Sequence, residues 1–214
     1  MKTFSLLVVS TTLVLAGCKQ RADTPAAGSA APAGSAATRP PVPTPDADHI
    51  EVLARHRPIA GKEDLDSDPV IVHFNKFAVT KASLDPKHLE GGTATIELDL
   101  TSIKSGSEER DGDLKAPEFL DTASFATATV DVANVKKQTD STYTADATVA
   151  CRGITKTYPL TFEVLATTAD SVRIKGELAF SRLDFAIGVD PAKDPTERVD
   201  TPLTIRWLLT IKKT

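Results

Sequence analysis

The sequence predicts an all-β domain over residues 47–214, built as a sandwich or a barrel of antiparallel strands. Apolar and polar residues alternate with a period of two in several segments, as they do on strands with one buried face. Gly, Asp, Asn and Pro turns separate most of these segments. No helical period continues beyond a turn or two, so we expect strands almost throughout.

Eight segments carry this pattern, five of them strongly and three more weakly. The strongest example lies near the C-terminus, where Leu203, Ile205, Trp207, Leu209 and Ile211 alternate with Thr204, Arg206, Leu208 and Thr210. The three weaker segments are the first, second and fourth of the series. In chain order, the expected strands are 50–57, 70–82, 94–101, 126–135, 143–151, 158–164, 172–181 and 203–211.

Residues 105–122 lack the alternation, and we expect a short helix or an irregular flap there. Eight strands close into a barrel just wide enough to be filled by side chains or to hold one small ligand. The strand 143–151 turns the small residues Ala145, Ala147 and Cys151 toward the apolar side. Small inward residues leave room in a lumen, or they face large residues such as Trp207 and Phe162. A hollow lumen and a packed core therefore both remain open.

The N-terminus has the parts of a secretory signal peptide. Lys2 supplies a positive start, residues 4–15 are apolar and uncharged, and small residues precede Cys18. The apolar run is shorter than the roughly 20 residues that span a bilayer. Residues 15–18 (Leu-Ala-Gly-Cys) resemble the bacterial lipobox, which implies cleavage before Cys18 and a diacylglycerol on its sulfur. The alternative is an ordinary secretory signal followed by a chance cysteine.

A tether is expected between this cysteine and the folded domain. Residues 22–45 are almost entirely Ala, Pro, Gly, Ser and Thr, and such a segment cannot bury enough surface to offset its ordering entropy. Its r.m.s. reach is roughly 30 Å. The expected organisation is a signal peptide (1–17), a lipidated cysteine and disordered tether (18–46), and one folded domain (47–214).

Charge and cysteine usage narrow the class of protein. The formal net charge is −4, and removal of Lys2 with the signal peptide makes it about −5, with basic and acidic residues interspersed. No basic footprint for nucleic acid is present. With Cys18 lipidated, Cys151 has no cysteine left to pair with. Its place in a strand pattern is more typical of a small buried hydrophobe than of a reactive thiol.

No motif for catalysis or metal binding is found. The sequence has no GxSxG elbow, HExxH, CxxC, GxGxxG or Walker loop. Asp64, Asp66 and Asp68 mimic the start of a calcium loop, but Pro69 replaces its required Gly and Asn75 its bidentate Glu. The sequence has four histidines, His49, His56, His73 and His88, and they are scattered without the spacing of metal ligands. We predict no enzymatic activity, no metal and no cofactor.

Four segments resemble the YceI-like family of exported lipid-binding proteins, in order and spacing. They are 89–103 (LEGGTATIELDLTSI), 110–121 (RDGDLKAPEFLD), 152–156 (RGITK) and 180–185 (FSRLDF). The resemblance covers roughly residues 48–214. It implies an eight-stranded antiparallel, lipocalin-like barrel whose apolar lumen takes the chain of an isoprenoid or a similar long lipid.

The chain departs from the family at positions that bear on a ligand headgroup. Asp113 and Arg152 stand where the family usually has histidines, and Phe119-Leu120 replaces its aromatic pair. By resemblance, Arg182 and Asp184 form a dyad that ties the barrel together near Phe185. The charged residues 108–111 either orient a headgroup at the barrel mouth or form a salt-bridged loop.

The leading hypothesis is a non-enzymatic, membrane-tethered module that holds a long apolar chain, such as an isoprenoid, quinone or fatty acyl chain. The alternative is a structural or interaction lipoprotein with a packed barrel, in which Trp207 plugs the floor instead of touching a ligand. Whether the domain forms a homodimer stays open. The predicted ligand-contacting residues are Ile96, Leu98, Val149, Phe162, Val164, Leu178, Phe180, Phe185 and Trp207.

The same reasoning gives an expected location. A lipidated Cys18 places the protein in the cell envelope, anchored by lipid and facing the periplasm. Lys19 follows the cysteine, and by resemblance to the sorting rule of Gram-negative bacteria a residue other than Asp favours the outer membrane.

Overall fold

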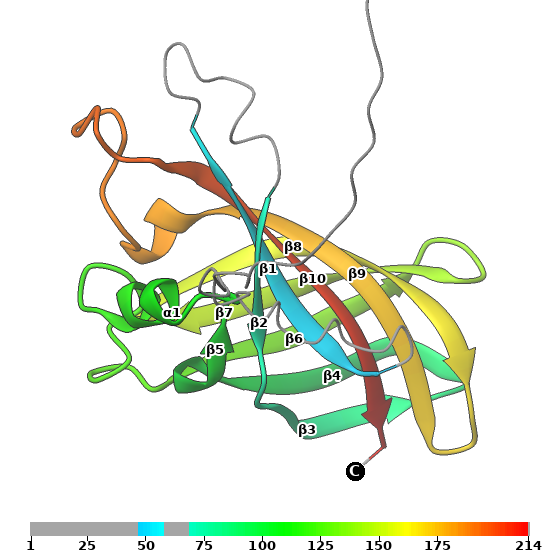
Figure 1. Ribbon diagram of the computed structural model, residues 1–214. Helices are drawn as coiled ribbons and strands as arrows, with labels where there is room; N and C mark the ends of the chain where they lie inside the picture. The colour runs from blue at the N-terminus through cyan, green and yellow to red at the C-terminus, as the bar shows by residue number, and fades with distance from the viewer. Residues whose placement is uncertain (1–46, 58–68, 214) are drawn as a thin grey trace, which may run out of the picture. The chain divides into compact units, whose positions relative to one another are not determined.

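The folded part of the chain consists almost entirely of antiparallel strands, as Figure 1 shows. The structure is a computed structural model that describes residues 47–57 and 69–213. The expected signal peptide, Cys18, the tether and the acidic run Asp64–Asp68 lie outside these residues. The elements are β1 (His49–His56), β2 (Val70–Phe74), β3 (Phe77–Asp85), β4 (His88–Asp99), η2 (Leu100–Ser102), β5 (Ile103–Lys104), α1 (Glu108–Lys115), β6 (Thr127–Lys137), β7 (Thr142–Cys151), β8 (Ile154–Thr167), β9 (Ser171–Ser181), η3 (Arg182–Phe185) and β10 (Val199–Lys212).

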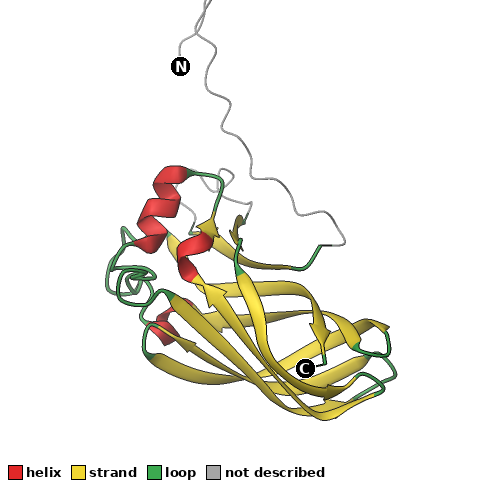
Figure 2. Ribbon diagram, turned by 90° about the horizontal axis from the view of Figure 1, so that it is seen from below, coloured by secondary structure: helices red, strands yellow, loops and turns green. Residues whose placement is uncertain are grey.

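All ten strands belong to one curled sheet in the order β3-β4-β6-β7-β8-β9-β10-β1-β2-β5. From β6 to β10 each strand pairs with the next one along the chain, as a meander does, and β1 then pairs with β10. Figure 2 shows the strands curling around a common interior. The all-β prediction is therefore confirmed. Within the described residues, no helix is long and apolar enough to cross a membrane.

Two bent segments close this sheet into a barrel. Strand β3 continues β2 after a bend at Asn75 and Lys76, and β5 continues β4 after η2. Because β2 pairs with β5 and β3 pairs with β4, the two ends of the sheet are held by the same two bent segments. The eight expected strands become ten because both of these segments are interrupted. Counted as continuous segments, they form the expected eight-membered ring.

Alternating residues of every strand point into the barrel, as the sequence pattern predicts. The register places Val52 of β1 and Leu178 of β9 on either side of Ile205 of β10, so their side chains share the inner face. Ala147 and Val149 of β7 are buried on the same face. The expected strand boundaries are wrong by several residues for β4 and β8, because alternation fades near the hairpins while backbone pairing continues.

The expected helix or flap in 105–122 contains one eight-residue helix, α1. The side chain of Ser107 caps its N-terminus by accepting a hydrogen bond from the backbone N–H of Arg110, and acidic residues fill its first turn. The helix has no apolar stripe, and Leu114 is its only apolar residue. It therefore needs polar contacts to hold it against the barrel.

The two ends of the barrel differ in how the chain turns. Short hairpins join the strands at one end, which we call the hairpin end, and η2, α1 and η3 gather at the other, the α1 end. A two-residue turn also lies at the α1 end, where Arg152 and Gly153 take φ values of 51° and 73° between β7 and β8. Positive φ at both central residues is the conformation that matches the twist of paired strands.

Candidate functional site

The barrel lumen is hollow and is divided into two chambers. The wide chamber at the α1 end has a volume of about 450 Å³, and the narrow chamber toward the hairpin end has a volume of about 110 Å³. Leu98, Val130, Val149 and Ile205 line both chambers and form a waist between them. The sequence left a hollow lumen and a packed core both open, and the structure shows the hollow one.

The narrow chamber is lined almost entirely by apolar groups. Its walls include Ile96 of β4, Phe162 of β8, Leu178 of β9 and Trp207 of β10, and among the described lining residues only Thr93 and the indole of Trp207 carry a polar side-chain group. A polar or charged ligand group would therefore find too few partners to replace its hydrogen bonds with water and would carry most of its desolvation cost here. The chamber therefore suits hydrocarbon alone.

The wide chamber is apolar on its barrel side and polar at its rim. Helix α1 contributes Glu109, Arg110 and Asp113 to the lining, while β1 contributes His56. Its volume falls within the range of roughly 300–1,000 Å³ typical of small-molecule sites, which combine apolar walls with a few polar groups. Of the charged residues 108–111, Glu109 and Arg110 line this rim, whereas Asp111 forms an ion pair with Lys104, so the structure contains elements of both arrangements that the sequence left open.

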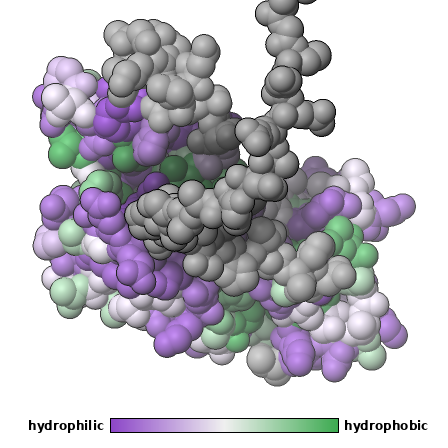
Figure 3. Space-filling model, viewed as in Figure 1, coloured by the Kyte–Doolittle hydropathy of each residue, from purple (hydrophilic) through white to green (hydrophobic). Residues whose placement is uncertain are grey.

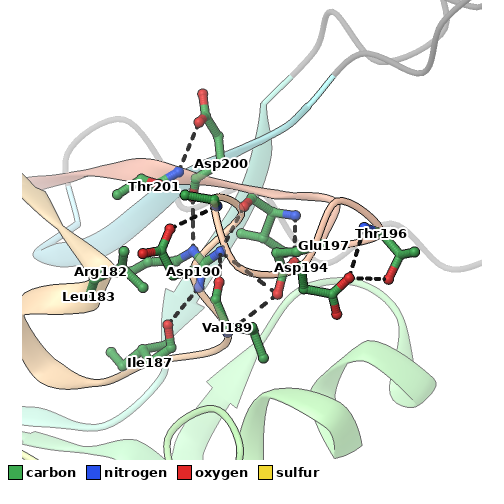
Figure 4. Close-up of polar contacts among 12 residues, drawn as sticks. Arg182, Leu183, Ile187, Val189, Asp190, Asp194, Thr196, Glu197, Asp200 and Thr201 are labelled. Atoms are coloured by element: carbon green, nitrogen blue, oxygen red, sulfur yellow. Dashed lines mark hydrogen bonds and ion pairs between the residues drawn. The ribbon is translucent and has the colours of Figure 1, made fainter.

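Arg182 is the most deeply buried charged residue of the described part of the chain, with 1% of its surface exposed. Its guanidinium donates hydrogen bonds to the backbone carbonyls of Ile187, Val189, Val199 and Asp200, at 2.7–3.0 Å (Figure 4). It also forms an ion pair of 3.7 Å with Glu197. Arg182 therefore fixes the loop between η3 and β10 at the rim of the wide chamber.

The expected dyad of Arg182 with Asp184 is wrong. Asp184 instead accepts a hydrogen bond of 2.9 Å from the hydroxyl of Tyr158. Residues two apart at the start of a 3₁₀ turn point in different directions, which takes the two side chains to different partners. Burial, followed by this contact with Asp184, raises the pKa of Tyr158. The phenol ring packs in turn on Phe180 and Phe185, with centroids 6.2 and 6.3 Å away.

Arg152 holds three loops together at the α1 end. Its guanidinium donates to the carbonyls of Phe119, Pro117 and Ala186, of which the last two lie 2.9 and 2.7 Å away. The segment after α1, the turn after η3 and the β7–β8 hairpin are thereby joined. The arginine that stands in place of a family histidine thus binds backbone carbonyls around the mouth.

Helix α1 is fastened to the barrel by a buried carboxylate. Asp111, 5% exposed, accepts hydrogen bonds from the backbone N–H of Ser105 (2.7 Å) and from its hydroxyl (2.8 Å), and pairs with Lys104 at 3.2 Å. Burial on its own would raise the pKa of Asp111. The hydrogen bonds from Ser105 and the charge of Lys104 outweigh burial and lower this pKa.

Cys151 lies at the end of β7 and lines the wide chamber, 8% exposed. Burial raises the pKa of its thiol, and the nearby charge of Arg152 offsets this only in part. The thiol is therefore protonated at neutral pH and forms part of the apolar wall.

Eight of the nine predicted ligand-contacting residues line one chamber or both. Val164 lines neither; it is partly buried, packs against the core and lies at the β8 bulge between Val164 and Ala166, where the regular register ends. The lining residues that sequence reasoning missed include Ile205 and Val130, although both belong to expected strands and share the inward parity. The eight predicted residues that line the chambers are Ile96, Leu98, Val149, Phe162, Leu178, Phe180, Phe185 and Trp207.

The histidines do not converge. His73 lies 3.7 Å from Glu51 on the outer face of the barrel, and His88 lies 3.8 Å from Glu90. The ring of His49 contacts the carbonyl of Ala47 at 2.8 Å. Within residues 47–57 and 69–213, no three His, Cys, Asp or Glu side chains are grouped so that they could hold a metal ion.

The outer surface contrasts with the lumen. The face shown in Figure 3 is largely hydrophilic, with hydrophobic residues in small separate areas. Among the described residues, the large hydrophobic side chains that are exposed belong to Ile71, Leu165 and Val189, from different parts of the barrel. The apolar side chains that lie side by side over a long stretch are those that line the two chambers.

A family model for the YceI-like domain matches residues 45–209. The chain belongs to the YceI-like family. The resemblance to this family and the expected lipocalin-like fold are thus confirmed. No curated protein matches the chain.

Solved structures with the same fold include other YceI-like proteins. The structure of BcnA from Burkholderia cenocepacia has a TM-score of 0.65 at 18% identity, over 77% of this chain and 96% of that one. A YceI protein from Campylobacter jejuni has a TM-score of 0.59 at 13% identity, over 68% and 85%. A polyisoprenoid-binding domain from Saccharophagus degradans has a TM-score of 0.58 at 14% identity, over 78% and 94%. At these identities the likeness concerns the fold.

Proposed function

We propose that this protein binds one long apolar chain, such as an isoprenoid, quinone or fatty acyl chain, inside its barrel, and that it is not an enzyme. The observation that carries the proposal is the pair of adjoining chambers, which share four lining residues and have largely apolar walls. Burial of apolar surface contributes about 25 cal/mol per Å², so a long chain binds tightly without polar contacts. The likeness to a polyisoprenoid-binding domain supports this proposal.

The two chambers also favour one orientation of a bound lipid chain. The narrow chamber has almost no partner for a polar group, whereas the rim of the wide chamber has Glu109, Arg110 and Asp113 of α1. The hydrocarbon end therefore lies in the narrow chamber, and the polar end lies under α1. The reverse orientation would bury a polar group without a hydrogen bond.

The length of the lumen bounds the length of a straight chain. Leu203 lines the wide chamber and Ile211 the narrow one, eight residues apart on β10, and Val199 lines the wide chamber four residues further out. A strand rises about 3.3 Å per residue and tilts by about 40° in such a barrel, so the stretch of lumen between Leu203 and Ile211 extends roughly 20 Å along the barrel axis. An extended chain advances about 1.2 Å per bond, which gives about 16 carbons. A longer isoprenoid would have to fold back or emerge at the rim.

Extraction of purified protein with organic solvent, followed by mass spectrometry, tests this function. We expect a lipid with a long apolar chain, or uptake of an added isoprenoid if the protein is isolated empty. Val130→Phe should abolish uptake because the ring obstructs the waist. Asp131→Phe is the matched control on the outer face of β6, where the residue is exposed, and should leave uptake unchanged. A barrel that stays empty with every added chain would refute the proposal.

We propose in addition that the domain is tethered to a membrane through a lipidated Cys18 and faces the periplasm, at the outer membrane. The lipobox-like residues before Cys18 and the Ala- and Pro-rich segment after it support this proposal. Metabolic labelling with radioactive palmitate tests it. Label should enter the wild-type protein and not Cys18→Ser, and label in neither protein would refute lipidation.

A further inference from the structure

A glycine opposite Trp207 makes room for the indole ring in the barrel wall. Gly176 of β9 pairs with Trp207 of β10 on one side and with Phe162 of β8 on the other. Its neighbours at the same parity, Ile174 and Leu178, line the narrow chamber, so Gly176 faces the lumen too. It is the one inward position of β9 without a side chain.

The indole occupies the space that a side chain at residue 176 would need. A Cβ built on Gly176 would overlap the indole Cζ2 and would lie only 2.9 Å from its Cε2. It would also lie 2.9 Å from the carbonyl oxygen of Thr161. The ring therefore sits in a notch of the wall, defined by Gly176 and its two paired strands, and lies close against the backbone of β9.

We propose that Gly176 determines how far a bound chain reaches into the lumen, a specificity role that rests on the proposed function. With any side chain at 176, the indole of Trp207 must leave the notch. Ile50, paired with Trp207 on β1, restricts movement to the other side, so the ring can move only toward the lumen. The narrow chamber has a volume of only about 110 Å³, and a displaced indole would fill much of it.

The consequence depends on the length of the ligand. A chain that is short enough to stay in the wide chamber does not reach Trp207, which lines only the narrow chamber. A chain that passes the waist lies against the indole face. Gly176 therefore favours long chains over short ones, and its replacement should remove this preference without closing the wide chamber.

The test uses two uncharged straight-chain alcohols, one of about 16 carbons that fills the lumen and one of about half that length. Trp207 is the single tryptophan of the chain, so its emission reports a ligand in the narrow chamber. Bound alcohol is quantified independently by extraction and mass spectrometry. For Gly176→Ala we expect the affinity for the long alcohol to fall by at least about tenfold, the change that follows when only about two methylene groups lose their buried site. Affinity for the short alcohol should not change.

A second variant, Trp207→Leu, separates the effect of the displaced indole from other effects of the added methyl group. In Trp207→Leu the shorter side chain does not reach the notch, so adding Gly176→Ala there should leave binding of the long alcohol unchanged. If Gly176→Ala folds only when it is combined with Trp207→Leu, this result also supports a clash between the indole and a side chain at position 176.

The proposal is overturned if Gly176→Ala binds the long alcohol like the wild type. It is also overturned if the alanine weakens binding or prevents folding equally in both backgrounds, because the Thr161 carbonyl would then explain the glycine. If the wild type binds neither alcohol, the proposed function itself fails.

Discussion

At the scale of single residues, two arginines stabilise loops through several hydrogen bonds each, and not through charge alone. Arg152 and Arg182 both donate to backbone carbonyls of loops at the α1 end, and Arg182 does so while nearly completely buried. Carbonyls that cannot form strand ladders still need donors when they are buried. A five-donor guanidinium supplies several of them from one side chain.

We expect Arg182→Met to lower the free energy of unfolding by about 3–5 kcal/mol, because it leaves buried carbonyls and the carboxylate of Glu197 without a partner. Chemical denaturation measures this loss. Lys175→Gln is the control, since its 3.0 Å ion pair with Glu163 is half exposed and should contribute less than about 1 kcal/mol. Equal losses in the two variants would contradict the role given to Arg182.

At the scale of elements, α1 is the part of the fold that depends most on a polar contact. Its sequence has one apolar residue, Leu114, so apolar burial contributes little to holding it in place. The buried contacts of Asp111 with Ser105 and Lys104 take that role. The polar rim of the wide chamber is thus positioned by a carboxylate that does not itself line the chamber.

This anchor makes stability depend on pH. The pKa of Asp111 is lowered in the folded protein, so the carboxylate stabilises the fold above its unfolded pKa of about 3.9 and loses this effect as pH falls through the folded value. Between the wild type and Asp111→Asn, the difference in unfolding free energy should be constant above about pH 5 and shrink below about pH 4. Denaturation curves measured across this range check it. A difference that does not vary with pH would show that the charge of Asp111 is not what holds α1.

At the scale of the whole molecule, ring closure creates the lumen. The bent segments β2–β3 and β4–β5 join the two ends of the sheet, and the small residues Ala147 and Cys151 of β7 then face an open space instead of a filled core. An empty lumen forgoes dispersion contacts that a ligand restores. The free energy of binding should therefore appear as stability of the whole barrel.

An alcohol of about 16 carbons should raise the unfolding temperature, because a ligand that binds only the folded state stabilises it by about 2.7 kcal/mol at 100 times its Kd. Thermal unfolding at several ligand concentrations measures the shift. Val130→Phe, with its waist obstructed, should show no shift, whereas Asp131→Phe should behave like the wild type. A shift of equal size in Val130→Phe would place the ligand outside the lumen.

Alternation in the sequence was enough to predict most of the strands and the side of each strand that faces inward. Alternation with a period of two is a local property, so it identified Ile96, Leu98 and Trp207 as inward without any knowledge of their neighbours. The lack of alternation in 105–122 likewise marked the segment that contains α1, although it left a helix and an irregular flap both open. The motifs of the YceI-like family then selected a barrel in place of a sandwich.

What the inward residues enclose depends on how the strands pair and close into a ring. Whether Ala147 faces a void or a large ring depends on the pairing of strands far apart in the chain, and so does the match of Gly176 with Trp207. The partner of Arg182 was likewise set by a loop that folds back from Glu197. Side-chain volumes are read from a sequence, but the space left between them follows from register and closure, which bring together residues that no local pattern connects.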